Sequence, residues 1–228
     1  MALPVLYRDG SFVGAFFAAD LPRAAALLAP STLEPWPILG RVMVLLIAFE
    51  YRDTSVGPNH EVGLAVLARR PGARPSLTRY LRDPRAQPEQ GLWVVKLPVD
   101  TEVARAGGVE VWGYPKYCTS IETRFSAEGA RVALADEFEL TCARSLAVER
   151  SGLPFVTLTR HEEGLRRTVV EVSSRARWST GAGTALRLKG EGPTAASLRA
   201  LNLDGASPVA IFRDDALQAT LPQGAHTA

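Results

Sequence analysis

Short apolar segments that recur along the second half of this chain constrain its fold more than any other feature. Turn signals such as Glu128-Gly129, Ser151-Gly152 and Glu163-Gly164 separate them, at roughly the 8–12-residue spacing expected of an antiparallel meander or barrel. Helical segments do not alternate with the strands as a parallel βαβ sheet requires. We therefore predict an α+β, mainly β fold in which residues 1–228 form a single barrel-like domain with a few outer helices. The predicted strands are Thr119–Phe125, Ala130–Leu134, Phe138–Ala147, Phe155–Arg160, Leu165–Val172 and Thr184–Lys189.

The first half of the chain mixes strand and helix signals. Arg41–Tyr51 is apolar along most of its length, which predicts a long buried strand, with Glu61–Ala68 as its partner. Asp20 precedes a helical segment as an N-cap would, and Gly107-Gly108 are expected to end another helix. Further predicted strands are Ser11–Ala18, Leu92–Leu97 and Val109–Trp112, and the predicted helices are Arg23–Leu28, Leu77–Leu81 and Asp100–Ala106, while Pro208–Thr220 fits either state.

The composition excludes several classes of partner. Hydrophobic residues make up 46% of the chain, which is typical of a globular protein with a core. The net charge is +2 and the arginines are scattered, so we expect no nucleic-acid partner. The longest apolar run, Val42–Phe49, is far shorter than a membrane span, and Met1–Pro4 lacks the basic start of a secretory signal. Two cysteines, Cys118 and Cys142, do not form a disulfide framework and fit a reducing compartment. We predict a cytoplasmic protein without a membrane partner.

Metal chemistry has little support in the sequence. The three histidines, His60, His161 and His226, are widely spaced, and no CxxC or HxxxH cluster occurs. His60 next to Glu61 is more typical of a turn than of a ligand pair. We therefore predict no metal site.

Lysine is nearly absent from the chain, and that makes one lysine a candidate nucleophile. Of the 26 basic residues only Lys96, Lys116 and Lys189 are lysines. Because a guanidinium is not deprotonated in proteins, arginine cannot replace lysine in amine chemistry. Lys116 follows a rigid proline in Gly113–Lys116 and lies between two tyrosines. The simpler interpretation is a solvated lysine at a strand end.

Amine chemistry at Lys116 needs a dry pocket and a proton carrier. A lysine forms a Schiff base with a ketone only as the free amine, which desolvation favours. Trp112, Tyr114 and Tyr117 are candidates to shield the amine from water, and Glu61 is a candidate acid and base if the fold brings it near.

The sequence resembles the acetoacetate decarboxylase family at several points in matching order. Gly108–Lys116 is similar to the family segment Gly-Arg-Glu-x-x-x-Tyr/Phe-Pro-Lys, whose lysine forms the Schiff base. Asp53–Gly63 is similar to the family segment that ends in Tyr-x-Glu-x-Gly, whose glutamate lies in the active site. Trp178, Gly181 and Thr184–Leu188 resemble the family's Trp-Thr-Gly stretch and its following strand. The resemblance implies an acetoacetate decarboxylase-like β-barrel with cone-like antiparallel sheets, usually homo-oligomeric. It also implies a lysine in an apolar cavity and no metal or organic cofactor.

The chain departs from the family pattern at four positions. Tyr117 stands where family decarboxylases have a second lysine, and Val109 stands where they have an arginine. Arg8 is the loose counterpart of an active-site arginine, and apolar Ile47 replaces an acidic residue, with Glu50 the nearest carboxylate.

Three functions stay open at this stage. The resemblance implies a Schiff-base lyase acting on a small keto acid or ketone, with Lys116 and Glu61 catalytic, and acetoacetate decarboxylase-like loss of CO2 as the leading reaction. A Schiff-base aldolase or dehydratase uses the same imine. A non-catalytic small-molecule-binding barrel is the alternative from another class. The substrate-binding candidates are Arg8, Glu110, Trp112, Tyr114 and Tyr117.

Overall fold

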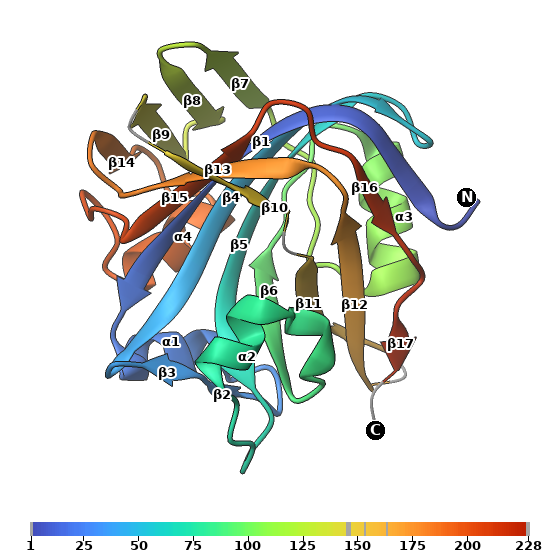
Figure 1. The fold of residues 1–228 in the computed structure, drawn as a ribbon, viewed down its shortest axis with the longest axis vertical. Helices are drawn as coiled ribbons and strands as arrows, with labels where there is room; N and C mark the ends of the chain where they lie inside the picture. Colours follow the sequence, from blue (N-terminus) through green and yellow to red (C-terminus); the bar gives the residue numbers. More distant parts are fainter. Residues whose placement is uncertain (1, 145–146, 153, 163, 227–228) are drawn as a thin grey trace.

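A closed barrel of seven strands is the centre of the fold in the computed structural model, which describes residues 2–144, 147–152, 154–162 and 164–226 (Figure 1). β1 pairs with both β4 and β16, and this double pairing closes the ring. Neighbouring strands are antiparallel except β6 and β11, which run parallel with Leu92 opposite Thr157. The expected all-antiparallel barrel is therefore a mixed one. In order around the ring the strands are β1 (Val5–Ala19), β4 (Arg41–Thr54), β5 (Asn59–Arg69), β6 (Gln90–Lys96), β11 (Phe155–His161), β12 (Gly164–Val172) and β16 (Ala219–Leu221).

Further strands extend the barrel and form a second sheet beside it. A ribbon of β15, β13 and β10 continues from β1, and three two-residue strands lie at the edges. The second sheet has the order β14-β9-β8-β7 and packs against the outer face of the barrel (Figure 1). These strands are β2 (Glu34–Pro35), β3 (Pro37–Ile38), β7 (Ile121–Ser126), β8 (Gly129–Leu134), β9 (Phe138–Ala143), β10 (Val148–Ser151), β13 (Arg175–Ser179), β14 (Thr184–Leu188), β15 (Ala210–Asp214) and β17 (Ala225–His226).

Helices lie outside the barrel, and two of them contribute residues to its two ends. α3 lies beside the start of β1 and β16, whereas α2 lies toward the opposite end (Figure 1). The described helices are α1 (Leu21–Leu28), α2 (Leu77–Arg82), the 3₁₀ turn η1 (Pro84–Ala86), α3 (Glu102–Trp112) and α4 (Pro193–Ala200).

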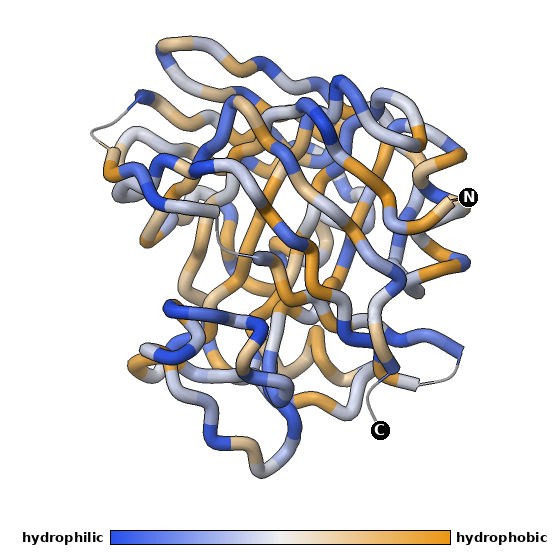
Figure 2. Tube along the Cα trace, turned by 45° about the vertical axis from the view of Figure 1, so that its right-hand side comes forward, coloured by the Kyte–Doolittle hydropathy of each residue, from blue (hydrophilic) through white to orange (hydrophobic). Residues whose placement is uncertain are grey.

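Both faces of the central strands are buried, which explains why they read as continuous apolar runs. Because successive side chains of a strand point to opposite faces, Leu45, Ile47 and Phe49 of β4 face the barrel interior, while Val44 and Leu46 join the core under the second sheet. Figure 2 shows the apolar residues gathered along the inner strands and hydrophilic residues along the outer loops. The barrel interior is therefore itself apolar, and a polar residue there stands out.

Most of the predicted elements are confirmed, with changed ends. β4 and β5 form the predicted antiparallel pair, with Glu61 opposite Phe49. α2 matches the predicted helix in the excursion between β5 and β6. The strand predicted over Phe138–Ala147 ends at Ala143, and residues 145 and 146 of it lie outside the described residues.

The end of α3 was predicted wrongly. The helix continues through Gly107-Gly108 to Trp112, so that Val109–Trp112 is its last turn and not a strand. Gly113 ends it in the left-handed conformation, with φ 65° and ψ 25°, and the Gly113 and Tyr114 N–H groups donate to Val109 and Gly108 carbonyls. The helix does end at a glycine, as predicted, but that glycine is Gly113.

Candidate active site

The turn after α3 fixes the Tyr-Pro-Lys segment against the end of β6. A β-carbon on Gly113 would collide with the Arg160 carbonyl, so glycine is needed there for space as well as for its backbone conformation. The Leu97 N–H donates to the Pro115 carbonyl at 3.1 Å and the Val99 N–H to the Tyr117 carbonyl at 3.0 Å. The backbone on both sides of Lys116 is thus anchored to the barrel.

Lys116 and Glu61 form a buried ion pair inside the barrel mouth. The Lys116 Nζ donates a short hydrogen bond to Glu61 Oε2, and the side chains are only 8% and 11% exposed. Glu61 lies on the inward face of β5, where alternation with Gly63 and Ala65 aims it at the interior. Removing two charges from water is costly unless each is compensated. Each charge here is compensated by the other, and a proton moved from one to the other leaves a neutral amine and a neutral acid.

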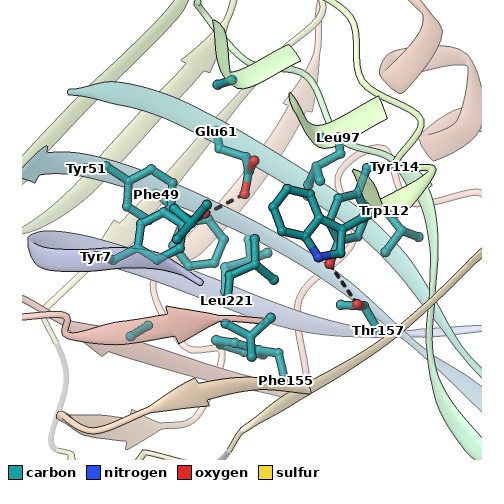
Figure 3. Close-up of a pocket in the computed structure, with 18 of the residues that line it drawn as sticks. Tyr7, Phe49, Tyr51, Glu61, Leu97, Trp112, Tyr114, Phe155, Thr157 and Leu221 are labelled. Carbon is teal, nitrogen blue, oxygen red and sulfur yellow. Dashed lines mark hydrogen bonds between the residues drawn. The ribbon is translucent and has the colours of Figure 1, made fainter. Parts of the chain in front are cut away.

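Three tyrosines lie around the pair, of which Tyr51 and Tyr114 are buried and Tyr7 is partly buried. The Tyr51 hydroxyl donates to Glu61 Oε1 at 3.3 Å, and the Tyr7 and Tyr51 ring centroids lie 4.4 Å apart (Figure 3). The Tyr114 hydroxyl is 2.9 Å from Thr157 Oγ1. Burial raises the pKa of Tyr7, Tyr51 and Tyr114 above the ordinary value, and the negative charge of Glu61 raises each pKa further. All three phenols therefore remain protonated at neutral pH.

The pair faces a mainly apolar cavity of about 110 Å³. Figure 3 shows Tyr7, Phe49 and Tyr51 on one side of it and Trp112 and Tyr114 on the other, with Glu61 between them. Of the described residues that line it, Lys116 and Glu61 are the charged ones. The lining also includes Val5, Ile47, Asn59, Gly63, Leu92, Val94, Leu97, Gly108, Phe155, Thr157, Val170 and Leu221.

The structure brings together four of the residues that the sequence singled out. Lys116, Glu61, Tyr114 and Trp112 all line this cavity. Trp112 also donates from Nε1 to the Pro222 carbonyl at 2.7 Å, which ties α3 to the segment after β16. The ring centroids of Trp112 and Tyr114 lie 6.1 Å apart, so the two aromatic side chains form one wall.

The other three sequence-derived candidates lie outside the cavity lining. The Tyr117 hydroxyl donates to Glu137 Oε1 at 2.7 Å and is equally close to Thr194 Oγ1. Glu110 is an exposed residue of α3, and Arg8 is half-exposed and paired with Asp53 at 3.1 Å. Alternation could not place Tyr117, because Tyr114–Tyr117 is irregular backbone and not a strand.

The departures from the family pattern leave the cavity without an arginine among its described lining residues. Val109 is exposed on α3, and Ile47 contributes an apolar side chain to the lining. Glu50, the nearest carboxylate by sequence, lies 3.8 Å from an Arg52 nitrogen and accepts a hydrogen bond from Thr123. It does not line the cavity.

Sequence reasoning missed four polar residues of the site, Tyr7, Tyr51, Asn59 and Thr157. Tyr51 could have been predicted, because strand alternation places it on the same face as Ile47 and Phe49. Tyr7 was hidden by Asp9-Gly10, which reads as a turn. In the structure these residues form an irregularity in β1, where the register with β4 shifts, and the strand starts at Val5.

No group of three or more potential metal ligands occurs among the described residues. His60 instead contacts Asp100, with Nδ1 2.7 Å from Oδ2. Within the same residues, no helix combines the length and apolar character needed to cross a membrane.

Solved structures share this fold over nearly the full chain. The acetoacetate decarboxylase of Legionella pneumophila superposes with a TM-score of 0.71 at 17% identity, covering 100% of this chain and 88% of that one. The enduracididine biosynthesis enzyme MppR, in complex with the condensation product of pyruvate and imidazole 4-carboxaldehyde, gives 0.65 at 15% identity, with 99% and 89% covered. An acetoacetate decarboxylase-like enzyme of Sphingomonas wittichii RW1 gives 0.64 at 14% identity, with 99% and 93% covered. No match was found among curated proteins.

The fold and the site define a β-barrel protein with a buried lysine–carboxylate pair in an apolar cavity. The chain belongs to the acetoacetate decarboxylase family, whose model matches residues 1–162. The matched range contains both Glu61 and Lys116, while β12 and all later elements lie beyond it. Family membership suggests an enzyme of the acetoacetate decarboxylase-like lyase superfamily.

Proposed function

We propose that this chain is a Schiff-base-forming lyase that acts on a small keto acid or ketone through Lys116, with decarboxylation as its reaction. The observation that carries the proposal is the buried Lys116–Glu61 pair at the wall of a cavity whose other described lining residues are uncharged. A lysine paired with a carboxylate in a mainly apolar cavity has both the nucleophile and the proton carrier that imine formation needs.

Imine formation begins with a proton transfer inside the pair. Glu61 takes a proton from Lys116, and the resulting amine attacks the carbonyl carbon of the substrate. The carbonyl oxygen takes a proton from Glu61 and the attacking nitrogen returns one, which gives the carbinolamine. Glu61 then protonates the carbinolamine hydroxyl, water leaves, and a positively charged iminium remains on Lys116. The Tyr51 hydroxyl, which donates to Glu61, holds the carboxyl group in place through these steps.

The iminium then accepts the electron pair that CO2 leaves behind. The bond between the carboxylate and the α-carbon of a 3-keto acid breaks, and its electrons neutralise the iminium to an enamine. A proton from water, passed through Glu61, adds to the enamine carbon, and a second water hydrolyses the new iminium to free Lys116 and a ketone. The overall reaction consumes one proton and releases CO2. A carboxylate in this cavity has no arginine partner among the described lining residues, so loss of its charge as CO2 is favoured.

The size of the cavity supports a small substrate. A dry cavity of about 150 Å³ takes benzene, a molecule of six carbon atoms. At the same density, the 110 Å³ next to Lys116 suits about four heavy atoms. Structures of MppR with pyruvate and with a pyruvate condensation product show that this fold holds keto acids in a relative.

A turnover assay tests the proposal. Acetoacetate and longer 3-keto acids are incubated with the protein and CO2 release is measured, next to Lys116→Arg and Glu61→Gln. Lys189→Arg is the matched control, because Lys189 is an exposed lysine paired with Glu139. We expect release with the wild type and the control, and loss in the other two variants. Equal release by wild type and Lys116→Arg would contradict the proposal, and no release from any keto acid would favour the non-catalytic binding barrel.

A further inference from the structure

A second apolar cavity of about 270 Å³ lies toward the α2 end of the barrel, away from Lys116. Its lining comes from β1, β3, β4, β5, β6, β11, β12, β13 and β15 together with α2 and η1, and includes Met43, Tyr80, Val172, Ala176 and Trp178. None of its described lining residues carries a charge. An uncharged cavity of this kind excludes a carboxylate, a phosphate or an ammonium group as its occupant.

One layer of side chains separates this second cavity from the catalytic one. Leu92 of β6 and Phe155 of β11 line both cavities. The Phe155 ring centroid lies 6.2 Å from that of Phe49, which lines the catalytic cavity, and 6.2 Å from that of Phe212, which lines the second. Phe155 is only half-buried by protein, because it stands between the two spaces.

The rim of the second cavity is exposed and apolar. Leu81 of α2 is 57% exposed and Val209, just before β15, is 53% exposed, and both line the cavity. The barrel interior thus runs from the Lys116–Glu61 pair, past Phe155, to an apolar rim at the other end. The catalytic end is the one with charged groups.

We infer that the substrate is a keto compound with a long uncharged chain, whose carbonyl lies at Lys116 and whose chain passes Phe155 into the second cavity. This inference rests on the proposed function for its carbonyl end. The volume sets the length of the chain: at the density of benzene in a 150 Å³ cavity, 270 Å³ holds about ten carbon atoms. An alkyl or aryl-alkyl chain meets the requirement of no charge.

We call the second cavity, as the place of the substrate's chain, the chain site. Binding of a series of methyl ketones, from 2-butanone to 2-decanone, tests the chain site without requiring imine formation. Calorimetry is done on Lys116→Arg, which keeps the pair's positive charge but cannot form an imine. Each added methylene is expected to tighten binding about fourfold, since the buried area grows with the chain. No dependence on chain length would overturn the inference.

Ala176→Phe tests whether the chain occupies the second cavity. Ala176 is buried on β13 and lines the second cavity but not the catalytic one. In this variant the longest ketones are expected to bind no better than the shortest, while 2-butanone is unaffected. Val209→Trp narrows the exposed rim and serves if Ala176→Phe fails to fold. Arg175→Leu, an exposed position of the same strand, is the matched control. Unchanged binding of the long ketones by both Ala176→Phe and Val209→Trp would overturn the inference. It would also be overturned if no ketone bound and Ala176→Phe dissociated an oligomer, because a second copy of the chain would then cover the rim.

Failure of the chain site and failure of the proposed function give different results. The same ketones are reduced with borohydride on the wild-type protein, where only an imine is trapped. Trapping that is equal for all chain lengths and insensitive to Ala176→Phe overturns the chain site and leaves the imine chemistry standing. Chain-length-dependent binding to Lys116→Arg without trapping on the wild type supports the chain site and overturns the imine chemistry.

Discussion

A β-carbon on Gly108 would lie 2.5 Å from Lys116 Cδ and 3.2 Å from its Nζ, so the lysine side chain occupies the space that a side chain at position 108 would need. Glycine in a helix interior costs roughly 0.5–1 kcal/mol relative to alanine. The space for Lys116 explains why α3 contains this glycine. The contact between Gly108 and Lys116 also explains why Gly107-Gly108, which predict a helix end, lie in the middle of α3.

Gly108→Ala is expected to displace Lys116 from Glu61 without unfolding the protein. The lysine chain is flexible and moves aside, while alanine favours the helix by about 0.5–1 kcal/mol. Imine trapping should therefore fall at least about tenfold, because a small displacement of a reacting group is enough for such losses, and the melting temperature should stay or rise. Gly107→Ala, one position away on another helix face, is the control. Equal trapping by the two variants would show that Gly108 does not make room for Lys116.

Glu61→Gln is expected to lower turnover by about 10²–10⁴-fold, because glutamine cannot carry the protons of imine formation. Breaking a buried pair also costs about 3–5 kcal/mol of stability, so thermal melting is measured alongside. Glu50→Gln changes a carboxylate on β4 outside the cavity and should keep its turnover. If Glu61→Gln turned over keto acid as fast as Glu50→Gln, Glu61 would not be the acid and base.

Tyr117→Phe is expected to leave imine trapping within about twofold of the wild type. Its hydroxyl contacts Glu137 and Thr194 and not the cavity, so the loss appears in stability, at about 0.5–1.5 kcal/mol per hydrogen bond. Tyr117→Lys should likewise fail to speed trapping, since a lysine in place of Tyr117 faces Glu137. Accelerated trapping in Tyr117→Lys would place position 117 at the catalytic amine after all.

Alkaline titration should find no tyrosine with an ordinary pKa in the folded protein. Burial raises the pKa of Tyr80 to about 12 and the pKa of Tyr7, Tyr51, Tyr114 and Tyr117 above the ordinary value, and these are the chain's five tyrosines. A folded-state pKa above the unfolded value of about 10 means that the stabilisation is complete below pH 10 and is lost as the pH rises above it. Tyrosinate absorbance should therefore rise together with unfolding, followed by circular dichroism. An ionisation step near pH 10 in a protein that is still folded would contradict the buried phenols.

The sequence predicts the barrel strands well where one physical signal dominates. The apolar run of β4 and its pairing with β5 follow from burial on both faces, and that pairing places Glu61 opposite Phe49. That Glu61 meets Lys116 came from the family resemblance, because no local pattern relates two residues 55 positions apart.

The rest depends on contacts that local patterns do not contain. Tyr7 enters the site because an irregularity at Asp9-Gly10 bends β1 without ending it. Tyr117 lies outside the cavity lining because its hydroxyl bonds to Glu137 and Thr194, which are distant in the sequence. The sequence could not show this, because irregular backbone has no regular alternation of side chains. The homo-oligomer and the absence of an organic cofactor remain predictions of the family resemblance.

Borohydride reduction in the presence of a keto compound tests the central claim most directly. An imine on Lys116 would be reduced to a stable secondary amine, and peptide mass spectrometry would locate it. We predict that a methyl ketone adds its mass, less one oxygen, to the peptide containing Lys116. Acetoacetate should add the mass of acetone, less one oxygen, because CO2 has left before reduction. Lys116→Arg should show no such adduct, while Lys189→Arg should. An adduct on Lys96 or Lys189 with Lys116 unmodified, or no adduct from any keto acid or ketone, would contradict the assignment of Lys116 as the nucleophile.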